Sequence, residues 1–158
     1  MAVKKGYTAK LYRNSGSYAS PTWVEVENII DLNFPHNFER LEAFTRGSGG
    51  VMEAEPGAMN LAFTFKIRSD ESDTDFTALE TAYEGRSLID FMILDGSSST
   101  NGSRGYRYEG KIFSFGEDQA LGNILYRDVS VEPCISSNAK KSVVVTSGAP
   151  VFTTLAVA

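Results

Sequence analysis

Two residue types that often perform nucleophilic or acid–base chemistry occur once each in this 158-residue chain, as His36 and Cys134. A Ser-His-Asp triad would have to use His36, which follows Pro35 in a predicted edge strand, and the chain contains no G-x-S-x-G elbow. An ordinary surface or stacking role is therefore expected for His36. Cys134 has no adjoining basic cluster that would lower the pKa of its thiol, which favours an inert cysteine. With one cysteine, an intrachain disulfide and a Cys-rich zinc module are both excluded.

Other patterns that resemble binding motifs lack essential parts. The acidic run at residues 70–75 places Asp75 where a calcium loop needs glycine, and helix capping explains the run better. The glycine-rich segment 47–50 is not followed by Gly-Lys-Ser/Thr, so it is no phosphate loop. Pairs of carboxylates exist, but nothing in their spacing selects one for glycoside chemistry. We predict no catalytic residue, no metal ligand and no cofactor.

Composition narrows the class of protein further. The net charge is −5, whereas a protein that grips duplex DNA normally presents a basic face. The net charge does not argue against a protein along which DNA moves without being bound. Tyrosines on predicted strands could stack on single-stranded nucleic acid, but Glu109 and Asp128 interleave with the nearby Arg107 and Arg127, which favours packing in the core or at a subunit interface. The N-terminal segment lacks the apolar core of a signal peptide, and no apolar run approaches a membrane span, so we expect a soluble protein made in a cytoplasm.

Period-two alternation of apolar and polar residues predicts most of the secondary structure. The cleanest stretch is 58–68, read as one strand with Met59, Leu61 and Phe63 on the same face. The apolar tail, about 139–158, is expected to pair with a strand or with a neighbouring molecule. The other predicted strands are 6–13, 22–27, 29–38 with an interruption at Pro35, 87–94, 106–115 with a change of phase at Gly110, and 124–133.

One segment has the period of a helix. Residues 72–84 place Phe76, Leu79 and Tyr83 on one stripe, and the segment ends at Gly85, which suits a left-handed cap. Ser72 is the predicted N-cap, with Asp75 three residues later. One amphipathic helix of about 12 residues is expected to pack on a sheet.

Residues 39–57 have a different character. These nineteen residues are charged, contain four glycines and a proline, and show no sustained period. Long segments without structure are uncommon in compact domains and usually have a function. We interpret this one as a contact loop that becomes ordered when it meets a partner.

The absence of alternating strands and helices predicts antiparallel sheets. The expected fold class is mainly β, an antiparallel barrel or sandwich of about seven or eight strands with one flanking α-helix. Residues 1–158 are expected to form a single domain with the contact loop at about 39–57 and the C-terminal extension at about 139–158.

The order of several short motifs carries a resemblance to a known family. G-x-x-A-x-L-Y at 6–12 precedes P-x-W at 21–23, and L-E-A-F-T-R-G-S-G-G follows at 41–50. E-P-G-A-M at 55–59 then leads into the long alternating strand, the helix and an apolar strand that ends at Asp95-Gly96. Over most of its length the chain resembles a bacteriophage major tail tube protein of the siphophage and prophage type.

The resemblance implies a structural virion protein rather than an enzyme. Family members join edge to edge into rings, typically hexamers, and the rings stack into a tail tube through which DNA passes during infection. The implied partners are other copies of the chain, the tape measure protein, the tail terminator and the baseplate or tip proteins; DNA would cross the lumen without specific binding, and no membrane is involved. The implied location is the virion tail, assembled in the host cytoplasm. Glu42, Arg46 and Glu53 become candidates for contacts between rings.

Two alternatives stay open. The chain could be the inner-tube protein of a contractile tail or of a secretion-like injection system, which shares the fold and differs in its partners. It could also be a small β-barrel that binds a ligand or acts as an enzyme. Self-assembly separates the first alternative from the second, because only tube proteins would polymerise.

Overall fold

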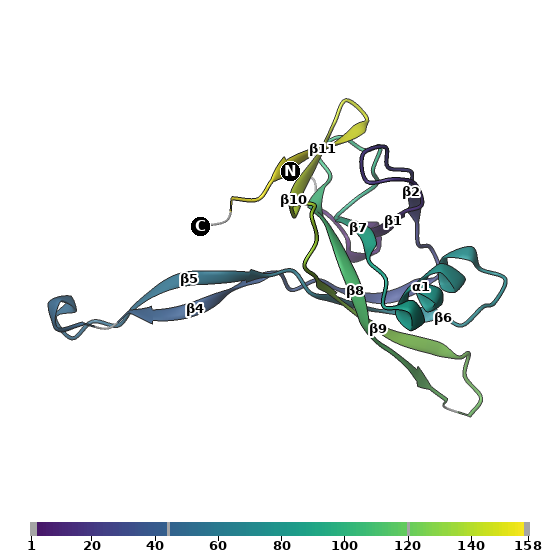
Figure 1. The fold of residues 1–158 in the computed structure, drawn as a ribbon, viewed down its shortest axis with the longest axis horizontal. Coiled ribbons are helices and arrows are strands. Elements are labelled where there is room, and N and C mark those ends of the chain that lie inside the picture. The colour runs from purple at the N-terminus through teal and green to yellow at the C-terminus, as the bar shows by residue number, and fades with distance from the viewer. Residues whose placement is uncertain (1–2, 44, 120, 157–158) are drawn as a thin grey trace.

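The structure is a computed structural model that describes residues 3–43, 45–119 and 121–156. Within these residues the chain is mainly β with one α-helix, which confirms the predicted fold class (Figure 1). Eleven strands are present in these described ranges instead of seven or eight, because one expected strand is divided and the expected loop and tail are both hairpins. The elements are β1 Lys10–Asn14, β2 Trp23–Glu25, β3 Ile29–Asn33, β4 Asn37–Ala43, β5 Glu53–Asn60, β6 Phe63–Arg68, α1 Thr74–Gly85, β7 Ile89–Leu94, β8 Arg104–Asp118, β9 Tyr126–Pro133, β10 Lys141–Thr146 and β11 Ala149–Thr154, with single 3-10 turns at Gly6–Thr8 and Arg46–Ser48.

The long strand β8 joins the two halves of the main sheet (Figure 1). Its first half pairs with β7 and β10, and its second half, from Gly110 onward, pairs with β9. The resulting order is β2-β1-β7-β8-β9-β6-β3, with the β10–β11 hairpin attached to β8, and every pairing is antiparallel. A strand that serves two sheets in this way makes the corner of a sandwich.

The inner faces of the two halves share one hydrophobic core. Phe63, Phe65 and Ile67 of β6 are buried, as the alternation of the sequence predicts. They contact buried side chains of β1, β7 and β9, and α1 adds Phe76 and Leu79 to the same cluster. The helix therefore closes the inner side of the sheet, as its apolar stripe predicts.

Strand β7 is buried on both of its faces. Phe91 and Ile93 point into the main core, whereas Met92 and Leu94 lie under the β10–β11 hairpin in a second cluster. This explains why its sequence is apolar without alternation. The predicted pairing of the C-terminal extension with a strand is confirmed, because β10 pairs with β8.

The helix begins and ends one residue later than predicted. Asp73, not Ser72, is the N-cap, and its side chain accepts a hydrogen bond from the amide of Asp75. Arg86 adopts the left-handed conformation (φ 55°) that was expected for Gly85. The difference at the N-terminus follows from Asp70, whose carboxylate accepts hydrogen bonds from the hydroxyl and the amide of Ser72 and so removes that side chain from the cap. These bonds, chiefly the one from the hydroxyl, lower the pKa of Asp70.

Two further sequence predictions need correction. The single strand expected at 58–68 is divided into β5 and β6 at Leu61, where the chain leaves one sheet and enters the other. The irregularity expected at Gly110 lies three residues later, because the register between β8 and β9 shifts between Ile112 and Ser114. Phe113 is the extra residue of this bulge, and its side chain is 57% exposed.

Gly105 on β8 lies where the neighbouring strand β7 leaves no room for a side chain. A Cβ atom at this position would lie 1.6 Å from the carbonyl oxygen of Ile93, whereas a Cβ atom at Gly116 would meet nothing within 4 Å. We expect Gly105→Ala to lower the free energy of unfolding by about 1–3 kcal/mol, because the strands must separate to admit the methyl group. Gly116→Ala is the matched control and should stay within about 0.5 kcal/mol of the parent in urea unfolding. Equal urea midpoints for the two variants would contradict the close approach.

Tyr108 makes a buried hydrogen bond that predicts an alkaline limit to stability. Its hydroxyl donates to the carbonyl oxygen of Leu61 at 2.5 Å, and burial raises the pKa of the phenol above its ordinary value of 10.0. Because the folded state favours the protonated form, this contribution is complete below pH 10 and is lost as the pH rises above it. We expect urea midpoints to fall above about pH 10, and to fall less steeply in Tyr108→Phe. At neutral pH, Tyr108→Phe should lower the free energy of unfolding by about 1–3 kcal/mol, because the buried carbonyl group of Leu61 loses its donor.

Candidate assembly surfaces

The most prominent surface feature is an arm formed by β4 and β5. These strands make a two-stranded sheet of their own, from Asn37 paired with Asn60 to Ala43 paired with Glu53. The arm projects from the rest of the chain (Figure 1), and every residue of β4 is exposed. The prediction that 39–57 has no secondary structure is therefore wrong. Whether this segment contacts a partner is a separate matter that stays a prediction.

All three predicted contact residues lie on the arm. Glu42 is on β4, Glu53 is on β5, and Arg46 begins the 3-10 turn near the tip. Glu42 lies 3.3 Å from the guanidinium of Arg40, in a pair that is more than 60% exposed on both sides. Such exposed pairs contribute little to stability, so these charges remain available to another molecule.

The arm also exposes large apolar side chains that its own fold cannot cover. Phe38 and Leu41 on β4 are 55% and 49% exposed, and Val51 and Met52 near the tip are 63% and 66% exposed. Leu41 lies against the backbone of Gly57 on the opposite strand, which leaves much of its surface in solvent. A two-stranded hairpin alone is only marginally stable in water, and exposed apolar groups along it are typical of an interaction site.

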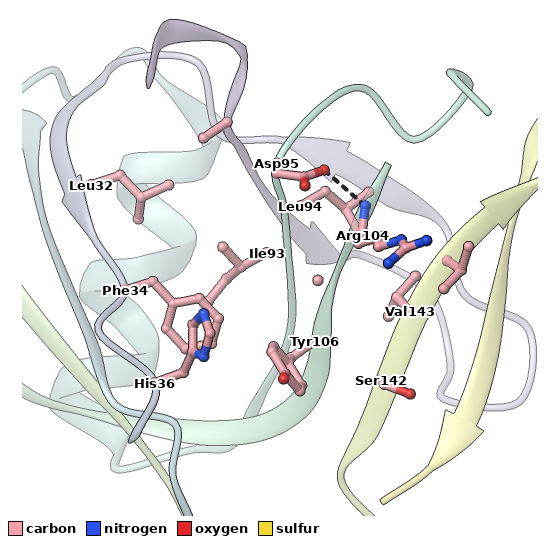
Figure 2. Close-up of a pocket in the computed structure, with 13 residues that line it drawn as sticks. Leu32, Phe34, His36, Ile93, Leu94, Asp95, Arg104, Tyr106, Ser142 and Val143 are labelled. Carbon is pink, nitrogen blue, oxygen red and sulfur yellow. Dashed lines mark hydrogen bonds between the residues drawn. The ribbon is translucent and has the colours of Figure 1, made fainter. Parts of the chain in front are cut away.

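An aromatic cluster at the base of the arm connects it to the main sheet (Figure 2). The ring of His36 lies 5.1 Å from that of Phe34 and 5.5 Å from that of Tyr106. Phe34 also packs edge-on against Phe63 in the core. The cluster borders a hollow of about 450 Å³ between β7, β8 and β10. This agrees with the ordinary surface or stacking role predicted for His36, whose side chain is exposed and whose ring lies at 55° and 50° to the rings of Phe34 and Tyr106.

The C-terminal hairpin is attached through a buried ion pair that sequence analysis did not find. Arg107 on β8 is 3% exposed and donates to both carboxylate oxygens of Asp90 on β7, with its shortest bond at 2.7 Å. The guanidinium also lies 3.9 Å from the ring centre of Tyr18, 4.9 Å from that of Trp23 and 4.6 Å from that of Phe152 on β11. Arg107 therefore belongs to the interior and not to a nucleic-acid surface. The sequence does contain a signal for this ion pair, because Asp90 is a charged residue within the otherwise apolar strand β7 and a buried charge needs a partner.

Among the described residues β11 pairs only with β10, which leaves its outer edge open. The hairpin turns at Ser147 and Gly148, whose φ angles of 53° and 76° define the type I′ geometry of a two-residue loop. Hydrogen-bonding groups alternate along a strand, so the edge away from β10 is formed at Pro150, Phe152 and later residues. Pro150 has no amide hydrogen, which limits what this edge can pair with.

Neither a metal site nor a membrane helix is found in the part of the chain that the structure describes. No group of three or more His, Cys, Asp or Glu side chains in residues 3–43, 45–119 and 121–156 is arranged to hold a metal ion. None of the helices in these ranges is both long and apolar enough to cross a bilayer.

Comparison with solved structures identifies the fold. The chain superposes on a chain from the tail of an empty gene transfer agent particle, refined with C6 helical symmetry, with a TM-score of 0.67 and 12% identity over 85% of this chain and 96% of that one. It matches the SPP1 tail tube with a TM-score of 0.67 and 14% identity, over 97% and 80% of the two chains. This chain has a tail tube fold.

A third structure agrees with the first two. A chain from the virion of a native gene transfer agent particle matches with a TM-score of 0.64 and 12% identity, over 96% of this chain and 99% of that one. No protein-family model and no curated protein sequence matches the chain. The tail tube fold predicted from the order of motifs is thus confirmed at the level of structure.

Proposed function

We propose that this chain is a structural virion protein that polymerises as stacked, hexameric rings to form a phage tail tube. The observation that carries the proposal is the tail tube fold, which spans 85–97% of the chain in the three superpositions. The C6 symmetry of one of those tails supports six copies in a ring. The role is one of assembly and not of catalysis.

The arm supports stacking of the rings. It presents exposed apolar side chains and the charged residues Glu42, Arg46 and Glu53 on a projecting hairpin. Eight residues of β5 extend the hairpin by roughly 26 Å, which is comparable to the width of a small domain. An arm of this length reaches a neighbouring copy, and we assign it to the contact between one ring and the next.

The remaining partners follow from this role. A tube that is closed at one end by a terminator and at the other by baseplate or tip proteins would enclose the tape measure protein first and DNA later. The net charge of −5 supports transit of DNA without specific binding, because an acidic wall repels phosphates. Assembly would take place in the host cytoplasm, and the finished protein would reside in the virion tail.

Electron microscopy of the purified protein tests the proposal. We expect concentrated protein to form rings or tubes in negative stain, and six-fold averages from end-on views. A sample kept dilute serves as the control, since assembly depends on concentration. Monodisperse globular monomers at every concentration, together with the absence of the protein from tails in a producing lysate, would overturn it.

A further inference from the structure

The loop between β7 and β8 contains the single Asn-Gly sequence of the chain, at Asn101 and Gly102. Both residues are exposed, whereas each of the other seven asparagines precedes a residue that has a side chain. Glycine has no Cβ atom, so its backbone nitrogen can approach the side-chain amide of the residue before it without hindrance. Attack by this nitrogen is the first step in the spontaneous loss of ammonia from asparagine. Asn101 is therefore the asparagine whose sequence most favours that reaction.

In the folded chain, both reacting groups are held by hydrogen bonds to the C-terminal hairpin. The amide of Gly102 donates to the carbonyl oxygen of Val145 on β10 at 3.0 Å. The side-chain oxygen of Asn101 accepts from the amide of Gly148, in the turn between β10 and β11, at 2.8 Å. While these bonds are made, the amide of Gly102 is directed at the hairpin and not at the side chain of Asn101. Attack therefore requires that the loop and the hairpin separate.

The hairpin has its own small cluster of buried side chains. β10 pairs with β8 over only four residue pairs. Its inward side chains, Val143 and Val145, belong to the second cluster of five buried residues and not to the main core of fifteen. Segments with few buried contacts open locally, at a lower free energy than the whole domain. We therefore expect the hairpin to open without unfolding of the main core.

We propose that Asn101 is a site of spontaneous deamidation and that opening of the C-terminal hairpin controls its rate. In the open form the nitrogen of Gly102 attacks the side-chain carbonyl carbon of Asn101. A new carbon–nitrogen bond closes a succinimide ring, and the amide nitrogen of the side chain leaves as ammonia with the proton of the attacking amide. Water then opens the ring at one of its two carbonyls, which gives an aspartate or an isoaspartate at position 101. The reaction needs no reactant besides water.

The isoaspartate product changes the attachment of the hairpin in one direction only. It routes the main chain through the former side chain of residue 101 and so adds one carbon atom to the backbone of the loop. The bonds to Gly148 and Val145 cannot then both keep their present geometry, whereas the aspartate product still offers an acceptor to Gly148. A copy that has opened is thereby marked and held less firmly. Aged protein rich in isoaspartate should exchange the amide hydrogens of Val145 and Gly148 faster than fresh protein, and equal exchange would overturn this consequence.

Mass spectrometry of protein aged in mildly alkaline buffer tests the proposal, which does not depend on assembly into tubes. Trypsin releases residues 87–104 as one peptide, in which Asn101 is the single asparagine. If the buffer is made with water enriched in heavy oxygen, this peptide gains the mass of an amide-to-acid conversion with one heavy oxygen atom. An isoaspartate-specific methyltransferase then separates the two products. Asn101→Gln is the control for the site and should give no labelled peptide over the same time.

Two matched substitutions test whether the hairpin controls the rate. Val145→Ala removes methyl groups from the second cluster, and Val129→Ala removes them from the main core, at positions that are both 2% exposed. We expect Val145→Ala to raise the deamidation rate at Asn101 about tenfold or more, because the rate follows the population of the open form. Val129→Ala should leave the rate within about twofold of the parent, provided that tryptophan emission shows both variants folded.

Three results would overturn the proposal. Equal acceleration by Val145→Ala and Val129→Ala would show that the reaction requires global unfolding. No acceleration by either, together with a rate in the folded parent equal to that in urea, would show that the hydrogen bonds to the hairpin do not restrain Asn101. A rate at Asn101 no higher than at the other asparagines of the urea-unfolded parent would remove the site itself.

Discussion

Asp90→Ala should lower the free energy of unfolding by about 3–5 kcal/mol, because it leaves the Arg107 guanidinium buried without its counter-charge. The side chains of this pair are only 8% and 3% exposed, so water cannot replace the carboxylate. Removal of the pair should also release the C-terminal hairpin, since Phe152 packs on the same guanidinium. Trp23, the single tryptophan, lies in the cluster and reports the change directly through its fluorescence.

Urea unfolding followed by tryptophan emission measures the effect. Asp128→Ala is the matched control, because the pair of Asp128 and Lys66 is 57% and 42% exposed and should contribute less than about 1 kcal/mol. The double variant Asp90→Met/Arg107→Met should recover much of the loss, because an apolar pair of similar volume carries no desolvation penalty. If Asp90→Ala and Asp128→Ala unfold at the same urea concentration, the pair does not attach the hairpin.

The parts of the fold that bury one face were predictable from sequence. In β6, the alternation of Phe63, Phe65 and Ile67 with polar residues reflects one side in the core and one side in solvent. Pro35 correctly predicted a break, and β3 ends before it. Alternation of apolar and polar residues reflects burial, so it is clear wherever a strand has one buried face and one solvent-exposed face.

The same reasoning explains why the arm was predicted as a loop. Every residue of β4 and six of the eight residues of β5 are exposed, so neither strand has a buried face that would require alternating apolar residues along its whole length. The break between β5 and β6 at Leu61 could not be predicted for a different reason. The apolar and polar residues go on alternating through Leu61, although the chain changes from one sheet to the other there. Asn60 was the available signal there: its side chain accepts a hydrogen bond from the amide of Ala62, which is typical of a turn.

The assembly surfaces were only partly predictable. The positions of Glu42, Arg46 and Glu53 on one projecting segment followed from the resemblance of motifs, and the structure does place them on one arm. Beyond Gly110, β8 pairs only with β9 among the described residues, and this open edge could not be predicted because it depends on where β7 stops pairing. An edge is a property of the topology and leaves no pattern in the strand that carries it.

Removal of the arm should abolish stacking without unfolding the domain. Phe38 and Met59 face each other in register, so an Asn-Gly turn can join them in place of residues 39–58 while Met59 stays packed against the core. The arm makes a sheet separate from the main one, and no residue of β4 is buried. We therefore expect an unchanged urea midpoint but a complete loss of tubes, with single rings as the largest species in sedimentation velocity and negative stain.

Point variants test whether stacking depends on the apolar side chains of the arm or only on the presence of the hairpin. Leu41→Ser and Met52→Ser keep the hairpin but remove exposed apolar groups, each worth about 1–2 kcal/mol when buried at an interface. Because the contact repeats in every copy of every ring, even such a loss should raise the concentration needed for tubes about tenfold or more. Ile135→Ser, at a residue 99% exposed outside the arm, is the matched control and should assemble as the parent does. Tubes of normal length from the armless chain would show that the rings stack through another surface, and the arm would then need a different partner.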